Sequence, residues 1–531
     1  MASSTAATTG TADVPADDAP GAAAAAADRA ATLVLDPAFS VGPVRRRTFG
    51  AFVEHLGRCV YTGIHDPGHP TADEDGFRGD VIDLTRELGV STVRYPGGNF
   101  VSGYRWEDGI GPVDQRPARL DLAWHSTEPN TVGVDEFMRW ARKAGVEPMM
   151  AVNLGTRGVQ EALDLLEYCN IASGTAWSDL RRTNGTEEPH GVRMWCLGNE
   201  MDGPWQIGHK TAEEYGRLAT ETARAMRMVD PGLELVACGS SSTSMPTFGE
   251  WERIVLTEAY EDVDLISAHA YYWEEDGDLA SFLASAVNMD GFIDDVVATA
   301  DAVRAARKLT KRIHISFDEW NVWYLNASPS QAPKDDWPVA PPLLEDHYSV
   351  ADAVVVGGLL ISLLRHTDRV HSASLAQLVN VIAPIMTEPG GRVWRQTTFH
   401  PFALTSRHAA GEVLRVKLDS PTHETAKFGE TPLVDAVATH DADSGEVVVF
   451  AVNRHTTEPV TVEVDVRAFG ALGVTEALTL SADDPYARAS ADDDTSLAPR
   501  PNETATAEGG TVRIELPPVS WSVLRLAPAG A

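Results

Sequence analysis

The strongest constraint on the fold is a regular alternation of short apolar runs and helical segments between residues 49 and 378. Runs that are apolar almost throughout are typical of strands buried on both faces, as in a parallel sheet. The eight runs are residues 49–54, 90–95, 147–153, 192–197, 233–238, 263–269, 312–317 and 372–378. Each is followed by a helix or a long loop, so the pattern predicts an α/β fold, a (β/α)8 barrel of TIM type.

An open, doubly wound sheet is the competing interpretation of the same alternation. That fold usually carries a glycine-rich phosphate loop after its first strand, and neither GxGxxG nor GxxxxGK stands there. The barrel makes a further demand, because the chemistry of barrel enzymes gathers at the carboxyl ends of the strands. Seven of the eight predicted strand ends carry polar residues: Glu54, Arg94 with Asn99, Asn153, Asn199 with Glu200, His269 with Tyr271, Glu319 and Gln377.

The pattern changes after residue 407 to short runs of alternating polarity that are separated by turn residues. Such runs without intervening helices predict an antiparallel β-sandwich. We therefore expect a disordered Ala-rich tail over residues 1–31, a strand over 32–47 that joins the sandwich as an edge strand, the barrel over 48–407, and the sandwich over 408–531. Within the sandwich, the acidic stretch 483–510 is expected to be a flexible surface loop.

The composition excludes several classes of function. A formal net charge of −34 disfavours binding to nucleic acid or to anionic membranes. The four cysteines lack metal-ligand spacing and are expected to be buried thiols. The first thirty residues show no basic and apolar pattern of a signal peptide, and residues 354–364, the nearest apolar run, are too short to span a membrane. We therefore expect a soluble, cytoplasmic protein.

Two strand ends carry a glutamate among aromatic residues. Glu200 lies in WCLGNEMDGPW and Glu319 in FDEWNVWY. In a closed barrel the two strand ends share one rim, so the two carboxylates are expected to face each other. Paired carboxylates suit the cleavage of a glycosidic bond, and the surrounding tryptophans and asparagines suit the binding of a sugar.

Other chemistries find weaker support in the sequence. The chain has no GxSxG elbow, no HExxH and no CxxC. His55, His65 and His69 lie near the first predicted strand, but their spacing is irregular and favours ordinary loop histidines over a zinc site. The paired glutamates therefore remain the best candidates for catalysis.

Long segments in the same order and spacing resemble the α-L-arabinofuranosidases of glycoside hydrolase family 51. These segments include FVEHLGRCVYTGI, VRYPGGNFVSGYRWEDGIGP, LDLAWHSTEPNTVGVDEF, WCLGNEMDGPWQIGH, SAHAYY, FDEWNVWY and AQLVNVIAPI. The resemblance extends from residue 49 to about residue 400 and continues more loosely through the sandwich. It is more specific than any single motif.

The resemblance implies a retaining, exo-acting enzyme that removes terminal arabinofuranosyl residues from arabinan- or arabinoxylan-type oligosaccharides. Glu200 matches the family's general acid/base and Glu319 its nucleophile. Positions that in the family bind substrate correspond here to Glu54, Arg94, Asn99, Trp124, Asn199, Tyr271, Trp323 and Gln377. The resemblance also implies a homo-oligomer, commonly a hexamer, and catalysis without a metal or other cofactor.

Two alternatives stay open at this point. A retaining β-glycosidase or an endoglucanase would use the same scaffold, and a sugar-binding homologue would have lost catalysis. The Pro-rich insert 327–345 follows Glu319 closely, and we expect it to roof the pocket or to form an ordinary surface loop. We further expect Arg94 and Tyr271 to favour the ionised form of Glu319 by charge and hydrogen bonding.

Overall fold

The computed structural model describes residues 30–325 and 336–528. Its centre is a closed barrel in which eight parallel strands follow one another in sequence order, and β12 closes the barrel by pairing with β3. The strands are β3 (Gly50–Phe52), β4 (Thr92–Tyr95), β7 (Glu147–Ala151), β8 (Met194–Leu197), β9 (Glu234–Ala237), β10 (Leu265–Tyr272), β11 (His314–Val322) and β12 (Val370–Leu375). The predicted barrel is confirmed, and the open doubly wound sheet is excluded.

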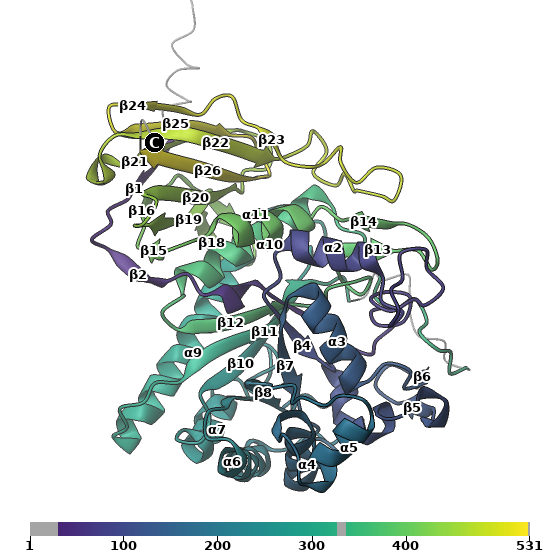
Figure 1. Ribbon diagram of the computed structural model, residues 1–531. Helices are drawn as coiled ribbons and strands as arrows, with labels where there is room; N and C mark the ends of the chain where they lie inside the picture. The colour runs from purple at the N-terminus through teal and green to yellow at the C-terminus, as the bar shows by residue number, and fades with distance from the viewer. Residues whose placement is uncertain (1–29, 326–335, 529–531) are drawn as a thin grey trace, which may run out of the picture.

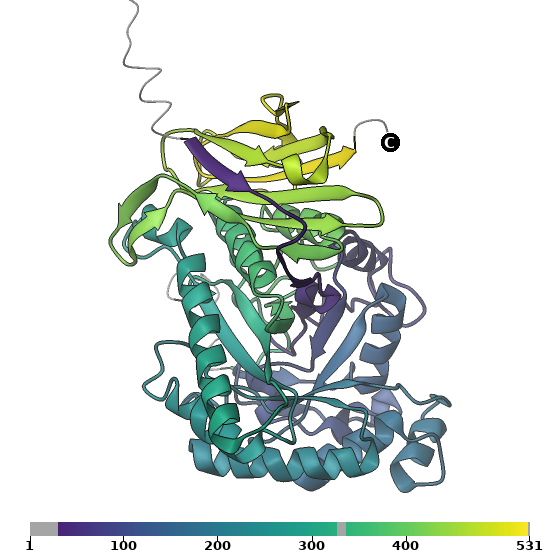
Figure 2. The same cartoon turned by 90° about the vertical axis from the view of Figure 1, so that its left-hand side faces the viewer.

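Helices surround the barrel in the two views of Figures 1 and 2. They are α2 (Gly79–Leu88), α3 (Val134–Ala144), α4 (Val159–Asn170), α5 (Ala176–Thr183), α6 (Ala212–Val229), α7 (Glu250–Ala259), α8 (Leu279–Leu283), α9 (Ala286–Arg307), α10 (Val350–Arg365) and α11 (Phe399–His408). The helices α2 and α3 end at Gly89 and Gly145, whose φ values of 78° and 77° lie in the left-handed region. Glycine adopts that conformation without the steric cost of a Cβ, so these two helix ends follow directly from the sequence.

Several short elements outside the barrel strands were not predicted. They are η1 (Arg46–Phe49), η2 (Asn99–Ser102), η3 (Trp106–Gly109), η4 (Val113–Gln115), the hairpin of β5 (Arg119–Asp121) and β6 (Ser126–Glu128), and the hairpin of β13 (Ile385–Thr387) and β14 (Val393–Arg395). The β5–β6 hairpin and η2 follow β4 in the chain, so both belong to the loops at the carboxyl ends of the strands.

Two sheets form the predicted sandwich, which packs beside α10 and α11 in Figure 1; their strand pairs are antiparallel except for β1 and β21, which pair in parallel. The seven-stranded sheet consists of β2 (Ser40–Pro43), β15 (Glu412–Leu414), β19 (Val434–Asp441), β20 (Glu446–Asn453), β26 (Ser520–Pro528), β22 (Leu472–Leu480) and β23 (Arg500–Pro501). The five-stranded sheet consists of β16 (Lys417–Asp419), β1 (Ala30–Val34), β21 (Val460–Asp465), β25 (Thr511–Leu516) and β24 (Thr506–Glu508). A small hairpin of β17 (Thr422–Thr425) and β18 (Gly429–Pro432) and the short helix η5 (Arg467–Phe469) complete this part.

The apolar helix α10 joins the barrel to the sandwich. It is buried along its length up to Leu364, because the barrel covers one face and β19, β20 and β26 cover the other. Gly357 allows the close approach, since a Cβ at that position would lie 2.1 Å from Cδ1 of Trp521 on β26. No helix within residues 30–325 and 336–528 combines the length and apolar character that a membrane-spanning segment requires.

The structure corrects two expectations about the sandwich. Residues 32–47 contribute to the sandwich as expected, but not as a single edge strand: β1 lies inside the five-stranded sheet between β16 and β21, and β2 is a separate strand at the edge of the other sheet. The acidic stretch 483–510 is more ordered than expected. It contains β23 and β24, and its Asp492 and Asp494 form ion pairs with Arg392 and Arg395.

Two further expectations concern segments that the structure describes only in part. Residues 1–29 of the predicted disordered tail lie outside the described residues, whereas Ala30 and Ala31 at its end already belong to β1. Of the Pro-rich insert 327–345, the part before residue 336 lies outside them as well. In the described part, Trp337 stacks on His125 of the β5–β6 hairpin with ring centroids 3.7 Å apart. This part of the insert therefore packs beside the hairpin that carries Trp124.

Candidate active site

The predicted site residues gather at the carboxyl end of the barrel. Arg94, Tyr271 and Glu319 lie within β4, β10 and β11, whereas the others belong to the segments that follow a strand. Those others are Glu54 after β3, Asn99 in η2, Trp124 between β5 and β6, Asn199 and Glu200 after β8, Trp323 after β11, and Gln377 after β12. Strands far apart in the chain thus bring these side chains to one rim, as a closed barrel requires.

Glu319 is buried and held at both carboxylate oxygens. Arg94 donates a hydrogen bond from Nη1 to Oε1 at 2.7 Å, and Tyr271 donates one from its hydroxyl to Oε2 at 2.8 Å. Burial is the largest influence on the pKa of Glu319 and raises it, and Glu200 adds to the rise, whereas His269, Arg94 and Tyr271 lower it. Arg94 and Tyr271 act in the expected direction, but they do not outweigh burial.

The carboxylate of Glu200 also has a hydrogen-bond partner at each of its two oxygens. Trp205 donates a hydrogen bond from Nε1 to Oε2 at 2.8 Å, and Oε1 lies 2.9 Å from Nδ1 of His269. The indole of Trp205 is 51% exposed, whereas Glu200 is 8% exposed. Glu200 therefore stands at the border between the buried rim and a solvent-facing aromatic surface.

His269 bridges three carboxylates. Its Nδ1 lies 2.9 Å from Glu200 and 3.6 Å from Glu319, and its Nε2 lies 2.9 Å from Oδ1 of Asp318. Burial by itself lowers the pKa of His269, but the charge of Glu319 and the hydrogen bonds with Asp318 and Glu200 outweigh it and raise the pKa to about 10. At neutral pH the ring is therefore an imidazolium that donates from both nitrogens.

Asp318 and the bridging role of His269 are functional features that the sequence reasoning missed. In a regular strand the side chains of consecutive residues point to opposite faces, so Asp318 and Glu319 would not share one. The pairing of β11 shifts register between Phe317 and Trp320, and that of β10 shifts between Ser267 and His269. Such irregularities re-aim side chains and are common beside active sites, which explains how both acids reach the barrel interior. The polar strand end at His269 was the only signal.

The two glutamates lie close together. One carboxylate oxygen of Glu200, one of Glu319 and a ring nitrogen of His269 all lie within 4.8 Å of one another. Among the described residues these three form the group compact enough for a metal ion. Both ring nitrogens of His269 already lie 2.9 Å from carboxylate oxygens, one of Glu200 and one of Asp318.

Glu54 forms a second acidic position on the same rim. Its Oε1 accepts hydrogen bonds from the backbone N–H of Phe100 and from Nε1 of Trp124, both at 2.9 Å, and its Oε2 accepts one from Nε2 of Gln377 at 3.0 Å. Burial raises the pKa of Glu54 to about 8 despite these donors. Glu54 therefore takes up a proton at a higher pH than an ordinary glutamate does.

Glycine makes room between the two acidic positions. A Cβ at Gly98 would lie 3.0 Å from Oε1 of Glu319 and 3.4 Å from Oε2 of Glu54. Such a Cβ would crowd the two carboxylates. The PGGN sequence after β4 therefore lets the backbone pass directly along both side chains.

The remaining predicted residues complete the rim. The amide of Asn199 accepts a hydrogen bond from Nη2 of Arg94 at 2.6 Å and donates one to Oδ1 of Asn99 at 3.4 Å. The ring of Trp323 meets that of Tyr271 edge to face, with centroids 4.9 Å apart. Aromatic faces beside hydrogen-bonding amides and carboxylates can bind the faces and hydroxyls of a sugar ring.

Comparison with known proteins agrees with this geometry. Residues 84–291 match the model of the α-L-arabinofuranosidase 1 domain, and residues 318–520 match that of the α-L-arabinofuranosidase C-terminal domain. The chain is 59% identical to an intracellular exo-α-(1→5)-L-arabinofuranosidase of Streptomyces lividans, over 94% of this chain and 76% of that protein. It is 58% identical to an exo-α-(1→6)-L-arabinofuranosidase of Bifidobacterium longum, over 93% of this chain and 97% of that protein.

Solved structures give the same result. A family 51 α-L-arabinofuranosidase from Bifidobacterium longum aligns with a TM-score of 0.90 and 51% identity, covering 93% of this chain and 99% of that chain. The arabinose complex of an α-L-arabinofuranosidase from Thermotoga maritima aligns with a TM-score of 0.83 and 34% identity, covering 94% and 100%. The chain therefore belongs to the α-L-arabinofuranosidases of glycoside hydrolase family 51.

Proposed function

We propose that this protein is a retaining exo-α-L-arabinofuranosidase in which Glu319 is the nucleophile and Glu200 the general acid/base. The relatives that are 58–59% identical carry the names of exo-α-L-arabinofuranosidases, which supports this activity for a chain matched over nearly all its length. The proposal assigns catalysis to residues 48–407. The eight residues that surround the two glutamates, including Glu54 and Trp124, would bind the arabinofuranose ring.

The separation of the carboxylates carries the proposal of a retaining mechanism. Retaining glycosidases hold their two carboxyl groups about 5 to 5.5 Å apart, whereas inverting enzymes need about 6.5 to 9.5 Å to admit a water. Oxygens of Glu200 and Glu319 lie within 4.8 Å of each other, which supports the retaining class. In the first step Glu319 would attack the anomeric carbon while Glu200 protonates the departing oxygen.

The change of charge between the two steps would let Glu200 act twice. After Glu200 has given its proton to the departing oxygen, its carboxylate would act as the base that activates a water against the glycosyl ester of Glu319. His269 and Trp205 would hold the carboxylate of Glu200 in one orientation through both steps, and the imidazolium would stabilise the charge left on Glu200 after it has given up its proton.

The names of the relatives narrow the range of substrates that we propose. One relative is named for the (1→5) linkage and another, almost equally similar, for the (1→6) linkage, so overall similarity does not decide between them. We propose arabinofuranosyl oligosaccharides of arabinan or arabinoxylan type as the substrate class. Five of the relatives are named intracellular, which supports a cytoplasmic location, and we propose a homo-oligomer as in the family.

Two substitutions test the catalytic roles, with Glu213→Ala on the exposed face of α6 as a control. For Glu319→Ala we expect kcat on nitrophenyl arabinofuranoside to fall by several orders of magnitude, and added azide to yield an inverted glycosyl azide. For Glu200→Ala we expect the rate of glycosylation to fall least for substrates with good leaving groups, because these need no proton. An unchanged rate in Glu319→Ala, or a uniform loss across leaving groups in Glu200→Ala, would contradict the assignment.

The same purified protein separates the alternatives. A retaining β-glycosidase or an endoglucanase would prefer nitrophenyl xyloside or cellulose to the arabinofuranoside. An inert sugar-binding homologue would bind arabinose-containing oligosaccharides without releasing arabinose. We expect the protein to release arabinose from the arabinofuranoside with retained anomeric configuration. Nuclear magnetic resonance of the anomeric proton would measure that configuration.

A further inference from the structure

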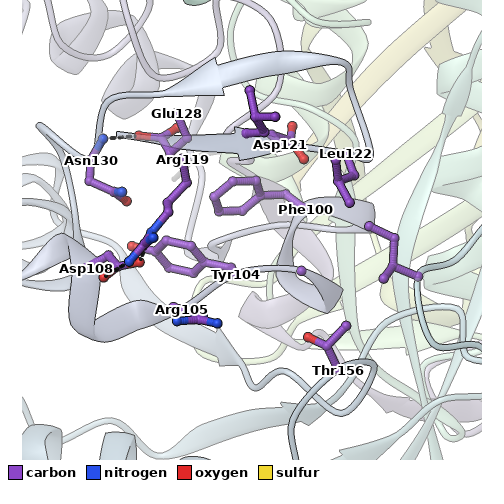
Figure 3. Close-up of a pocket in the computed structure, with 13 residues that line it drawn as sticks. Phe100, Tyr104, Arg105, Asp108, Arg119, Asp121, Leu122, Glu128, Asn130 and Thr156 are labelled. Carbon is purple, nitrogen blue, oxygen red and sulfur yellow. Dashed lines mark hydrogen bonds and ion pairs between the residues drawn. The ribbon is translucent and has the colours of Figure 1, made fainter. Parts of the chain in front are cut away.

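The β5–β6 hairpin carries Trp124, which donates to Glu54, yet the hairpin buries little apolar surface. Its Leu120 and Leu122 are 57% and 65% exposed. Within residues 119–128, all of which the structure describes, the buried side chains are those of Asp121, Ser126 and Glu128. A cavity of about 240 Å³ lies beside the hairpin (Figure 3). Because a two-stranded hairpin alone is marginally stable, polar contacts must hold this one in place.

The buried carboxylate of Glu128 ties the end of β6 to the segment after β3. Its Oε2 lies 2.9 Å from Nδ1 of His55, whose side chain is fully buried. Carboxylate oxygens accept hydrogen bonds, so Nδ1 is the donor. The other oxygen, Oε1, accepts from the hydroxyl of Tyr61 and, at 2.7 Å, from the backbone N–H of Asn130, which a dashed line marks in Figure 3. These three donors hold the carboxylate in one orientation.

His55 connects this carboxylate with the rim of the barrel. It follows Glu54 in the chain, and its Nε2 lies 2.8 Å from the hydroxyl of Tyr95 on β4. Its ring stacks on that of Phe100, with centroids 4.8 Å apart and an angle of 20° between the planes. Phe100 in turn donates its backbone N–H to Glu54 at 2.9 Å. The surroundings of His55 are therefore also those of Glu54.

Other contacts attach the hairpin to loops. Thr127 donates its backbone N–H to the carbonyl oxygen of Pro338 at 3.0 Å and its hydroxyl to that of Trp337 at 2.7 Å. Arg119 pairs with Asp108 at 2.8 Å. The contact between Glu128 and His55 differs from these because it reaches the segment that carries Glu54.

We propose that His55 and Glu128 are positioning residues that hold the β5–β6 hairpin so that Trp124 stays on Glu54. The hairpin is attached to two consecutive residues of the segment after β3, since Trp124 contacts Glu54 and Glu128 contacts His55. The inference rests on the proposed function, in which Glu54 and Trp124 bind the arabinofuranose ring. His55 and Glu128 would not touch the sugar, and they would act through Trp124 and Glu54.

Two substitutions of Glu128 test its role in catalysis. Glu128→Ala removes the acceptor for His55, whereas Glu128→Gln keeps the shape and one acceptor oxygen. For nitrophenyl arabinofuranoside we expect KM to rise roughly tenfold in Glu128→Ala and roughly threefold in Glu128→Gln, with smaller changes in kcat, because binding of the ring is weakened in ground state and transition state alike. An unchanged KM in both variants would overturn the proposal.

Asp435→Asn is the control for a loss of stability. Asp435 is also a buried acid, 6% exposed, and it accepts a hydrogen bond from Arg454 at 2.7 Å, but it lies on β19 of the sandwich. We expect this variant to lower Tm and to leave KM unchanged. A rise in KM as large as that of Glu128→Ala would attribute both effects to stability and would contradict a positioning role.

A double-mutant cycle tests whether Glu128 acts through Trp124. Trp124→Phe removes the Nε1 donor to Glu54 and keeps an aromatic ring. In that background Glu128→Gln should raise KM by less than about twofold, since the contact that it protects is already lost. The same factor with and without Trp124→Phe would show that Glu128 acts by another route, and it would refute the proposal.

Hydrogen exchange measures the hairpin without relying on turnover. In Glu128→Gln, and in His55→Phe, which keeps a ring against Phe100 but lacks both nitrogens, we expect the amides of residues 119–128 to exchange roughly tenfold faster, while those of β19 and β20 stay unchanged. If the wild-type protein fails to release arabinose, the proposed function fails, yet faster exchange in the hairpin still supports the attachment. Unchanged exchange in both variants would refute the attachment while leaving arabinofuranosidase activity intact.

Discussion

Tyr271→Phe removes one hydrogen bond from the proposed nucleophile and little else. The hydroxyl of Tyr271 donates to Oε2 of Glu319 at 2.8 Å, while its ring keeps the edge-to-face contact with Trp323. This donor lowers the pKa of Glu319 against the larger effect of burial, so its loss makes the carboxylate harder to ionise. The acid limb of the profile of kcat/KM against pH should therefore move to higher pH.

The size of the effect follows from the kind of hydrogen bond. A hydrogen bond to a charged group contributes about 1.5 to 3 kcal/mol, and about 1.4 kcal/mol corresponds to a factor of ten. On the acid limb we expect kcat/KM for nitrophenyl arabinofuranoside to fall roughly 10- to 100-fold. On the plateau, where Glu319 is ionised in both proteins, the loss should be smaller.

Tyr272→Phe is the matched control on the same strand. Tyr272 donates to Oδ1 of Asn288 at 3.2 Å, away from the catalytic rim, so the same chemical change should leave the pH profile in place. Initial rates across pH 4 to 8 for the three proteins measure the difference, with the range chosen around the ordinary pKa of about 4.3 for a glutamate and the rise caused by burial. An acid limb that stays in place or moves to lower pH in Tyr271→Phe, or an equal loss at every pH, would refute the reasoning.

Two further predictions concern stability. Gly357→Ala places a Cβ 2.1 Å from Trp521, so we expect a loss of about 1 to 3 kcal/mol and a lower Tm, whereas Gly358→Ala, whose Cβ meets only an ordinary contact at 3.8 Å, should not lower Tm. The stacked rings of His314 and His371 lie 3.5 Å apart, and burial first, then nearby positive charges, lower their pKa values to about 4 and about 3, from 6.5. Between pH 6.5 and about 4 the unfolded chain therefore binds more protons than the folded chain, so Tm should drop as the pH falls through that window. In a variant with glutamine at both positions, scanning calorimetry at several pH values should show a smaller drop in Tm. An equal drop in both proteins would contradict this explanation.

Much of the fold was accessible from the sequence because parallel barrel strands carry a local signature. Buried strands are apolar throughout, and glycines such as Gly89 and Gly145 mark the ends of helices, so the eight units could be counted along the chain. The apolar sequence of α10 also predicted a buried segment, although its length and composition alone do not say what covers it. No local sequence pattern predicted the position of β1, since its partners β16 and β21 lie hundreds of residues away in the chain.

The active site also has features that could be predicted from the sequence and features that could not. The shared rim of Glu200 and Glu319 could be predicted from the chain, because topology sends the carboxyl end of every barrel strand to the same side. The contacts of His269 with Glu200 and Asp318 could not, since they join residues 49 to 69 positions apart and depend on a register shift in β11. Periodicity describes one strand at a time, whereas a shift in register is set by how neighbouring strands pack, and so it has no local signature in the chain.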